Sequence, residues 1–243
     1  MRVALISDLH GNDVSLAAVL DDITGQGADE TICLGDVATL GPRPHEVIGR
    51  LKDLGCRCIL GNHDAFMFDE ELIRTYTDAP IVVEAVDWCR ERLSAGEIDY
   101  LRGFAANIRM ELGGGSTLFL FHGSPRSHME DLLATTDPEE LDRALGEASA
   151  TVMAGGHTHI QMLRQHRGTL LVNPGSVGMP FKEFVNGCAP RIMPYAEYAL
   201  IDGDGPNVEV TLRRVAVDKR KLRARSAASD NPICRSLEQQ YSL

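Results

Sequence analysis

The chain has 243 residues and a formal net charge of −11. This length is enough for one well-buried core, and no linker marks a second, so we expect a single domain over residues 1–243. The negative charge disfavours nucleic acid as the main partner. No apolar stretch approaches the roughly 20 residues of a membrane-spanning helix. The first residues also lack the long apolar stretch of a signal peptide, so we expect a cytoplasmic protein without a membrane partner.

Two features of the composition say little about function. The six cysteines are scattered and form no CxxC pair, which is typical of reduced, mostly buried thiols in a cytosolic protein. Residues 213–225 hold seven basic residues and one acidic residue. We interpret this run as a solvated strand end and helix face, with a phosphate- or partner-binding patch as the alternative.

The first 64 residues predict alternating strands and helices. Short apolar runs that end at Gly or Asp predict strands at 3–6, 31–34 and 58–60. Apolar residues at helical spacing predict one helix from residue 12 or 13 to about Gly25 and another from Pro44 to about Gly55. This β-α-β-α-β order is expected of a layered α/β sheet.

Residues 65–110 break this alternation. Their apolar residues suggest two or three helices with no strand between them. We interpret the segment as a helical insertion beside the site, which serves either as a lid or as plain covering for the core.

The alternation then resumes. Strands are predicted at 117–121, after a Gly113-Gly114-Gly115 turn, and at 151–154, 169–172, 199–202 and 208–213. A helix is predicted from Asp137. Residues 216–243 are expected to form a C-terminal helix and tail.

Five separated stretches place potential metal ligands directly after predicted strands. In open α/β sheets, ligands bind outside the carboxyl ends of the strands, so we expect these stretches to meet. They contain five of the eight histidines, a sorting that random placement would not produce. The stretches are Asp8-Leu9-His10-Gly11-Asn12, Gly35-Asp36, Gly61-Asn62-His63-Asp64, His122-Gly123 and Gly155-Gly156-His157-Thr158-His159.

Each stretch alone has a structural alternative. Asp8 could cap a helix, Asp36 and Asn62 could serve turns, and His122 could be a hydrogen-bonded core histidine. His157 and His159 form the strongest pair, because neutral imidazole is the commonest metal ligand and an exposed turn can present both rings.

The combination is more specific than its parts. Mixed carboxylate, imidazole and amide ligands suit Mn, Fe, Co, Ni or Zn better than Ca or Mg, and the thiolates of a structural zinc site are missing. The donors suffice for two ions, and a pair of metal ions is suited to phosphate ester chemistry.

The ordered set Asp-x-His, Gly-Asp, Gly-Asn-His-Asp, His and Gly-His-x-His resembles the signature of the calcineurin-like metallophosphoesterases over roughly residues 1–215. Further segments are similar to the small bacterial and archaeal phosphodiesterase branch: His10-Gly11-Asn12, Gly41-Pro42-x-Pro44, the insertion around Trp88 and Leu93, and Asn173-Pro174-Gly175-Ser176. The resemblance implies an α/β fold, a four-layer αββα sandwich in which two mixed β-sheets are flanked by helices, with a two-metal site at the loops.

The resemblance also implies roles for single residues. Asp8, His10 and His159 would bind one divalent ion, Asn62, His122 and His157 the second, and Asp36 would bridge both. Mn is the favoured metal, with Fe, Ni, Co or Zn as alternatives. A metal-bridging hydroxide would then attack phosphorus in line.

The same resemblance implies that His63 is catalytic. It matches the position that faces the substrate and donates a proton to the leaving alkoxide, and the ordinary pKa of histidine suits this role. A hydrogen bonder outside the ligand set is the alternative. Adjacency suggests that Asp64 orients the His63 ring.

The second motif departs from the protein phosphatases. Their second Asp and phosphate-clamping Arg are replaced by Thr39 and Leu40. This shifts the expectation towards phosphodiesters. Arg126 and His128, just beyond His122, could replace part of the lost positive charge, or they could form a solvated loop.

We therefore expect a dinuclear-metal phosphoesterase, foremost a phosphodiesterase, acting on a small phosphate ester. The alternatives are a phosphomonoesterase or a nucleotide or protein phosphatase of the same superfamily, a nuclease, and a non-catalytic metal-binding scaffold. The sequence identifies no substrate-binding residues and leaves a homo-oligomer open.

Overall fold

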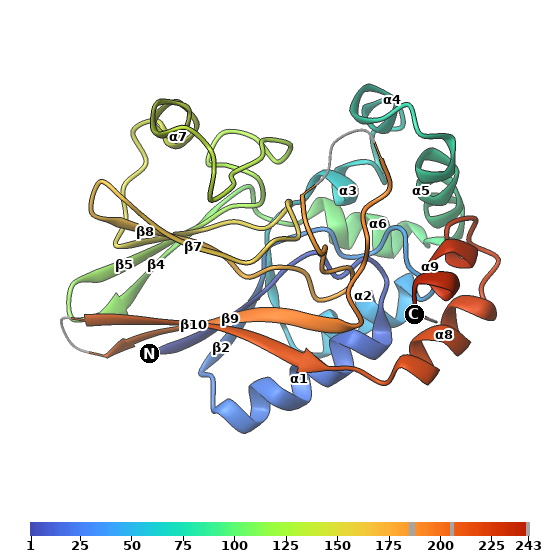
Figure 1. Cartoon of the computed structure of the whole chain (residues 1–243), viewed down its shortest axis with the longest axis horizontal. Helices are drawn as coiled ribbons and strands as arrows, with labels where there is room; N and C mark the ends of the chain where they lie inside the picture. Colours follow the sequence, from blue (N-terminus) through green and yellow to red (C-terminus); the bar gives the residue numbers. More distant parts are fainter. Residues whose placement is uncertain (185–187, 205–206, 242–243) are drawn as a thin grey trace.

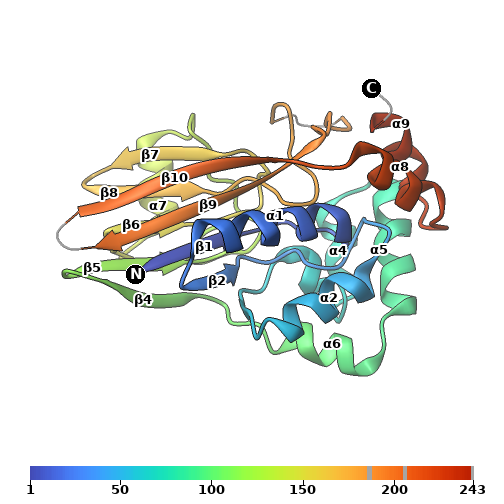
Figure 2. The same ribbon diagram turned by 90° about the horizontal axis from the view of Figure 1, so that it is seen from below.

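The computed structural model describes residues 1–184, 188–204 and 207–241. Two mixed five-stranded sheets lie face to face, with helices on both outer sides (Figures 1 and 2). The predicted four-layer α/β sandwich is confirmed.

The first sheet has the order β10-β9-β1-β2-β3. β1, β2 and β3 run parallel, while β9 is antiparallel to β1 and β10 antiparallel to β9. Its strands are β1 (Arg2–Ile6), β2 (Glu30–Cys33), β3 (Arg57–Cys58), β9 (Tyr195–Asp204) and β10 (Asn207–Ala216).

The second sheet has the order β4-β5-β6-β8-β7. β5, β6 and β8 run parallel, with β4 and β7 antiparallel at the two edges. Its strands are β4 (Ile108–Gly113), β5 (Ser116–Leu120), β6 (Val152–Ala154), β7 (Met162–His166) and β8 (Thr169–Asn173).

The alternation of side chains along β1 shows why the layers form. Val3 and Leu5 pack into the core between the sheets, whereas Ala4 and Ile6 pack into the core under the helices. A strand covered on both faces needs an unbroken apolar sequence rather than an alternating one. The carboxyl end of β1 is thus fixed deep inside the protein, where Asp8 follows.

The helices cover both outer faces and one end of the sandwich. α1 (Asp13–Gln26) and α2 (Pro44–Asp53) lie against the first sheet, and α7 (Pro138–Leu145) lies against the second (Figure 1). The remaining helices gather at the end where β1 and β2 point: α3 (Asn62–Ala65), α4 (Leu72–Tyr76), α5 (Pro80–Arg92), α6 (Ala95–Arg102), α8 (Lys219–Ala227) and α9 (Cys234–Gln240).

Several local predictions differ from the structure. The range 65–110 holds α4, α5 and α6, but its last residues begin β4, a strand that the sequence prediction missed, as it missed β7. Both missed strands lie at sheet edges, and only two residues of each are buried. The predicted strand at 58–60 is shorter, at Arg57–Cys58, and the C-terminal range 216–243 holds two helices rather than one.

Ion pairs within the protein neutralise part of the positive charge of residues 213–225. Arg213 pairs with Asp22 at 2.8 Å and Arg214 with Glu197 at 3.0 Å. Arg225 pairs with Asp13 at 3.2 Å.

No helix among the described residues is both long enough and apolar enough to cross a membrane.

Candidate metal centre

The carboxyl ends of neighbouring strands bring the five ligand stretches together. The Asp8 N–H donates to the Gly35 carbonyl at 3.0 Å, which joins the loops after β1 and β2. The His157 N–H donates to Asp8 Oδ2 at 3.1 Å, which joins the two sheets. All seven predicted metal ligands and His63 lie in this one cluster, and every one of these side chains is buried.

The backbone is strained where the ligands sit. Among the described residues, seven that are not glycine have a positive φ, and five of these are predicted ligands. Such conformations cost energy and persist at functional sites, where the surrounding structure enforces them. The five are Asp8, His10, Asp36, His157 and His159, with φ between 45° and 69°.

One group of ligand atoms consists of Asp8, His10 and His159, whose ligand atoms all lie within 4.8 Å of one another. His10 Nε2 is 3.0 Å from His159 Nε2, and His159 Nε2 is 3.4 Å from Asp8 Oδ1. Asp8 Oδ1 is buried and has no hydrogen-bond partner.

A second group consists of Asp36, His122 and His157, again within 4.8 Å of one another. The Asn62 amide oxygen joins them, because Asn62 Oδ1 is 3.1 Å from His122 Nε2. The Asn62 amide nitrogen is buried without a partner.

Asp36 lies between the two groups. Its Oδ2 is 3.9 Å from His10 Nε2 and 3.4 Å from His122 Nε2. Its Oδ1 accepts a hydrogen bond from the His63 N–H at 2.8 Å, which fixes the carboxylate plane. Gly61 permits this approach, because a Cβ there would collide with Asp36.

In His122 and His159, the hydrogen bond made by Nδ1 shows whether Nε2 is free to bind a cation. His122 Nδ1 contacts the Leu34 carbonyl at 2.7 Å and must donate to it, so in the neutral ring Nε2 is an acceptor that faces two oxygens, those of Asn62 and Asp36. His159 Nδ1 likewise donates to the Met179 carbonyl at 2.8 Å. Lone pairs that converge in a buried space repel unless a cation lies among them. The donor set therefore fits divalent metal ions.

The electrostatics of the site favour the ligating form of two rings. Burial, together with neighbouring histidines, lowers the pKa of His10 to about 3 and that of His157 to about 3. Both rings are therefore neutral, as metal ligation requires. Burial opposes a charge on His122 as well, but Asp36, Asp8 and the hydrogen bond to Leu34 together outweigh it and raise the pKa of His122 to about 9.

Thr39, rather than Asp64, contacts the ring of His63. Thr39 Oγ1 lies 2.8 Å from His63 Nδ1. The prediction that Asp64 orients this ring is wrong, because the Asp64 carboxylate accepts hydrogen bonds from backbone N–H groups instead, at 2.8 Å from Asp36, 2.9 Å from Val37 and 3.1 Å from Gly61. Asp64 thus shapes the loops that present the ligands.

Comparison with known proteins identifies the family. Residues 1–189 match the model of the calcineurin-like phosphoesterase superfamily domain. The chain belongs to this superfamily. The predicted family is thereby confirmed.

Relatives of the chain match it over nearly its whole length. The uncharacterized protein MJ0912 of Methanocaldococcus jannaschii is 27% identical over 234 residues, which cover 90% of this chain and 89% of the relative. Phosphodiesterase YfcE of Escherichia coli K12 is 28% identical over 214 residues, 84% of this chain and 89% of the relative. The crystal structure of a metallophosphoesterase from Sphaerobacter thermophilus is 26% identical with a TM-score of 0.75, covering 100% of this chain and 99% of that one.

The basic residues beyond His122, Arg126 and His128, do not form a clear phosphate-binding clamp. Arg126 is exposed and binds the carboxylate of Glu130 through two guanidinium nitrogens. His128 is half-buried, and burial together with His122 lowers its pKa. Arg126 therefore fits the alternative of a solvated loop better than that of a replacement for the phosphate-clamping arginine.

The turn at residues 173–176 connects two ligand loops, a role that sequence analysis missed. Asn173 Nδ2 donates to the Gly156 carbonyl at 2.6 Å, beside His157. The Ser176 hydroxyl donates to the Asp8 carbonyl at 2.7 Å. The only sequence signal was the likeness of this segment to the phosphodiesterase branch, which says nothing about its contacts.

Glu197 lies beneath this turn and predicts a pH effect on stability. Its carboxylate is buried and accepts from Arg214 at 3.0 Å. Burial, only partly offset by Arg214, raises its pKa from 4.5 to about 7. Because a raised carboxyl pKa favours the protonated folded state, its contribution to stability is fully present below pH 4.5 and is lost as the pH rises through about 7.

We therefore expect Glu197→Gln to flatten the pH dependence of unfolding. Urea unfolding of chelator-treated protein should show that the free energy of unfolding of the variant, relative to wild type, rises by up to about 3 kcal/mol between acid and mildly alkaline pH. Glu209→Gln, at an exposed position on β10, is the matched control. A difference that stays constant with pH would contradict the assignment.

Proposed function

We propose that the protein is a metal-dependent phosphodiesterase that hydrolyses a small phosphate ester at this centre. The observation that carries the proposal is the position of Asp36, whose Oδ2 faces both ligand groups while its Oδ1 holds the backbone of His63. The name of the relative from Escherichia coli, phosphodiesterase YfcE, supports the same reaction class.

In this proposal the ligands divide as the two groups do. Asp8, His10 and His159 would hold one metal ion, Asn62, His122 and His157 would hold the second, and Asp36 would be available to both. Mn is the favoured metal, because the donors mix carboxylate, imidazole and amide, and Fe, Ni, Co and Zn suit the same set. When bound, the two ions supply the Lewis acidity that activates water and polarises the phosphoryl oxygens.

The side chains of the chain supply orientation and proton transfer. His63 lies beside the first group, with its ring 5.0 Å from that of His10, centroid to centroid, and it donates a proton to the leaving alkoxide in this proposal. Thr39 fixes the ring through Nδ1, which leaves Nε2 for the substrate. These roles of Thr39 and His63 match general acid catalysis, in which a positioned group protonates the leaving oxygen.

The residue after Thr39 favours diesters over monoesters. Leu40 is nearly buried and takes the place of the arginine that clamps phosphate in protein phosphatases. A monoester carries about two negative charges at neutral pH and a diester carries one, so the loss of a guanidinium weakens the binding of a monoester more.

Metal removal tests the proposal directly. Protein treated with EDTA should lose hydrolysis of bis-p-nitrophenyl phosphate, and added Mn²⁺ should restore it, with weaker or no turnover of p-nitrophenyl phosphate. Restoration should track the uptake of about two equivalents of metal, measured by isothermal titration. If the protein binds metal yet stays inert with Mn, Fe, Ni, Co and Zn alike, the scaffold alternative replaces the enzyme.

A further inference from the structure

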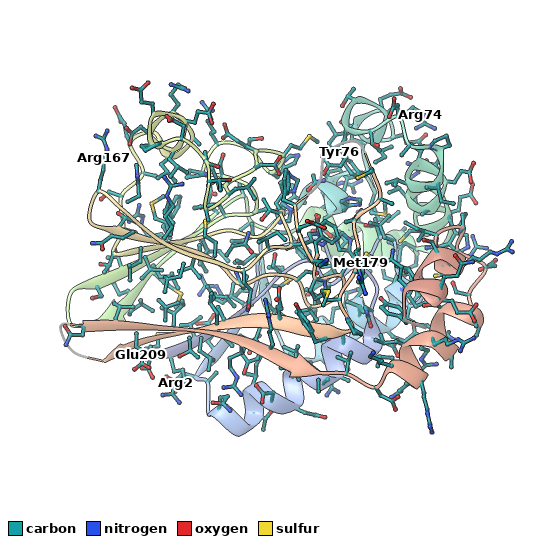
Figure 3. All side chains as sticks on the ribbon, in the orientation of Figure 1. Arg2, Arg74, Tyr76, Arg167, Met179 and Glu209 are labelled. Atoms are coloured by element: carbon teal, nitrogen blue, oxygen red, sulfur yellow. The ribbon has the colours of Figure 1, made fainter. Side chains whose placement is uncertain are left out.

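Tyr76 places an aromatic ring beside the metal centre, on a helix that contributes no ligand. It is the last residue of α4, and 42% of its surface is exposed, so the ring is open to solvent and to a bound molecule. Figure 3 shows Tyr76 on the side of α4 towards the loops at the strand ends and Arg74 on the outer side.

Three contacts fix the ring. Its centroid is 6.1 Å from that of His63, 6.2 Å from that of His157 and 5.6 Å from that of Phe66. His63 and His157 belong to different ligand stretches, so Tyr76 reaches both the proposed proton donor and the second ligand group. Phe66 is fully buried behind it and supports the ring from the protein side.

The face of the Tyr76 ring is an uncharged aromatic surface beside the metal centre, and we call it the aromatic wall. A phenol is uncharged at neutral pH, so Tyr76 does not repel an anionic phosphate. Asp131, 3.5 Å from His157, adds negative rather than positive charge on the same side. The wall therefore does not serve the phosphoryl oxygens, and it faces whatever substituent the phosphate carries.

We propose that Tyr76 forms an aromatic subsite for a planar ring on the leaving-group side of the phosphodiester, either an aryl group or a nucleobase. The assignment rests on the proposed function, since it is His63, the proton donor to the leaving group, that Tyr76 adjoins. Aromatic stacking accepts any flat π-face without hydrogen-bond readout, so it selects a class of substrate rather than one compound.

Direct binding to the Mn-loaded protein tests the subsite without turnover. Isothermal titration with phenylphosphonate and methylphosphonate compares ligands that share the metal-binding group and differ in the ring. Wild type should bind phenylphosphonate about tenfold more tightly. Tyr76→Ala should remove this preference and leave methylphosphonate binding unchanged, whereas Tyr76→Phe should keep it.

The matched control is Ile81→Ala, which removes an exposed apolar side chain from the neighbouring helix α5. This variant should keep the preference for phenylphosphonate. Adenosine 5′-monophosphate separates the two sources of the ring: a loss of its affinity in Tyr76→Ala points to a nucleobase, and an effect on phenylphosphonate alone points to an aryl ester. Equal affinity of wild type for the two phosphonates, or no binding of phenylphosphonate by protein that has taken up Mn²⁺, overturns the subsite. If the protein takes up no Mn²⁺ in the first place, the metal-centre proposal fails instead.

Discussion

Asp36→Asn should abolish phosphodiesterase activity and leave the fold intact. Removing a hydrogen-bond partner outside the ligand set typically costs roughly 10- to 100-fold in metal affinity or activity, so loss of the shared ligand itself should exceed about 100-fold. An amide keeps the oxygen that accepts from the His63 N–H, but it cannot supply a negative charge to two cations at once.

The expected signature is a split between folding and metal content. The metal-free variant should still fold cooperatively but unfold below the wild-type temperature, because the amide removes the charged partner that raises the pKa of His122. Metal measured by mass spectrometry should fall below two equivalents per chain. Asp99→Asn, at an exposed helical position, is the control. Full activity with a full metal complement in Asp36→Asn would refute the shared-ligand assignment.

The strand ends explain why so much of the site could be predicted from sequence. The apolar residues of β1 and β2 indicate buried strands, and a ligand stretch follows each strand directly. Because parallel strands end at a common edge, order along the chain translates into proximity in space. The structure brings Asp8 and Asp36 together in this way, whereas His122 follows β5 of the second sheet and meets them only because the two sheets pack face to face.

The contacts that sequence reasoning missed depend on side-chain direction across long separations. Asp64 was assigned to its chain neighbour His63, yet its carboxylate binds three backbone N–H groups. Thr39 was noted only as a lost Asp, although its hydroxyl reaches the His63 ring. Tyr76 lies in a segment whose helical periodicity fixes secondary structure but not the angle at which the helix packs. None of these contacts has a periodic or spacing signal.

His63→Ala should lower kcat by roughly 100- to 10,000-fold on substrates with poor leaving groups, the range typical of general acid catalysis. The loss should shrink for p-nitrophenyl esters, whose leaving group departs without a proton. Metal content should not change, since His63 belongs to neither ligand group. An equal loss for both kinds of ester would favour the alternative role of His63 as a mere hydrogen bonder beside the site.

The contact with Thr39 makes this prediction sharper. Thr39→Val keeps the shape of the side chain and removes the oxygen that lies 2.8 Å from His63 Nδ1. We expect a smaller loss, about 10-fold, with the same dependence on the leaving group, because the ring remains but is less well oriented. Thr39→Ser retains the hydroxyl and should behave like wild type. If Thr39→Val lowers metal content instead, its hydroxyl acts on His10, 3.5 Å away, rather than on the proton donor.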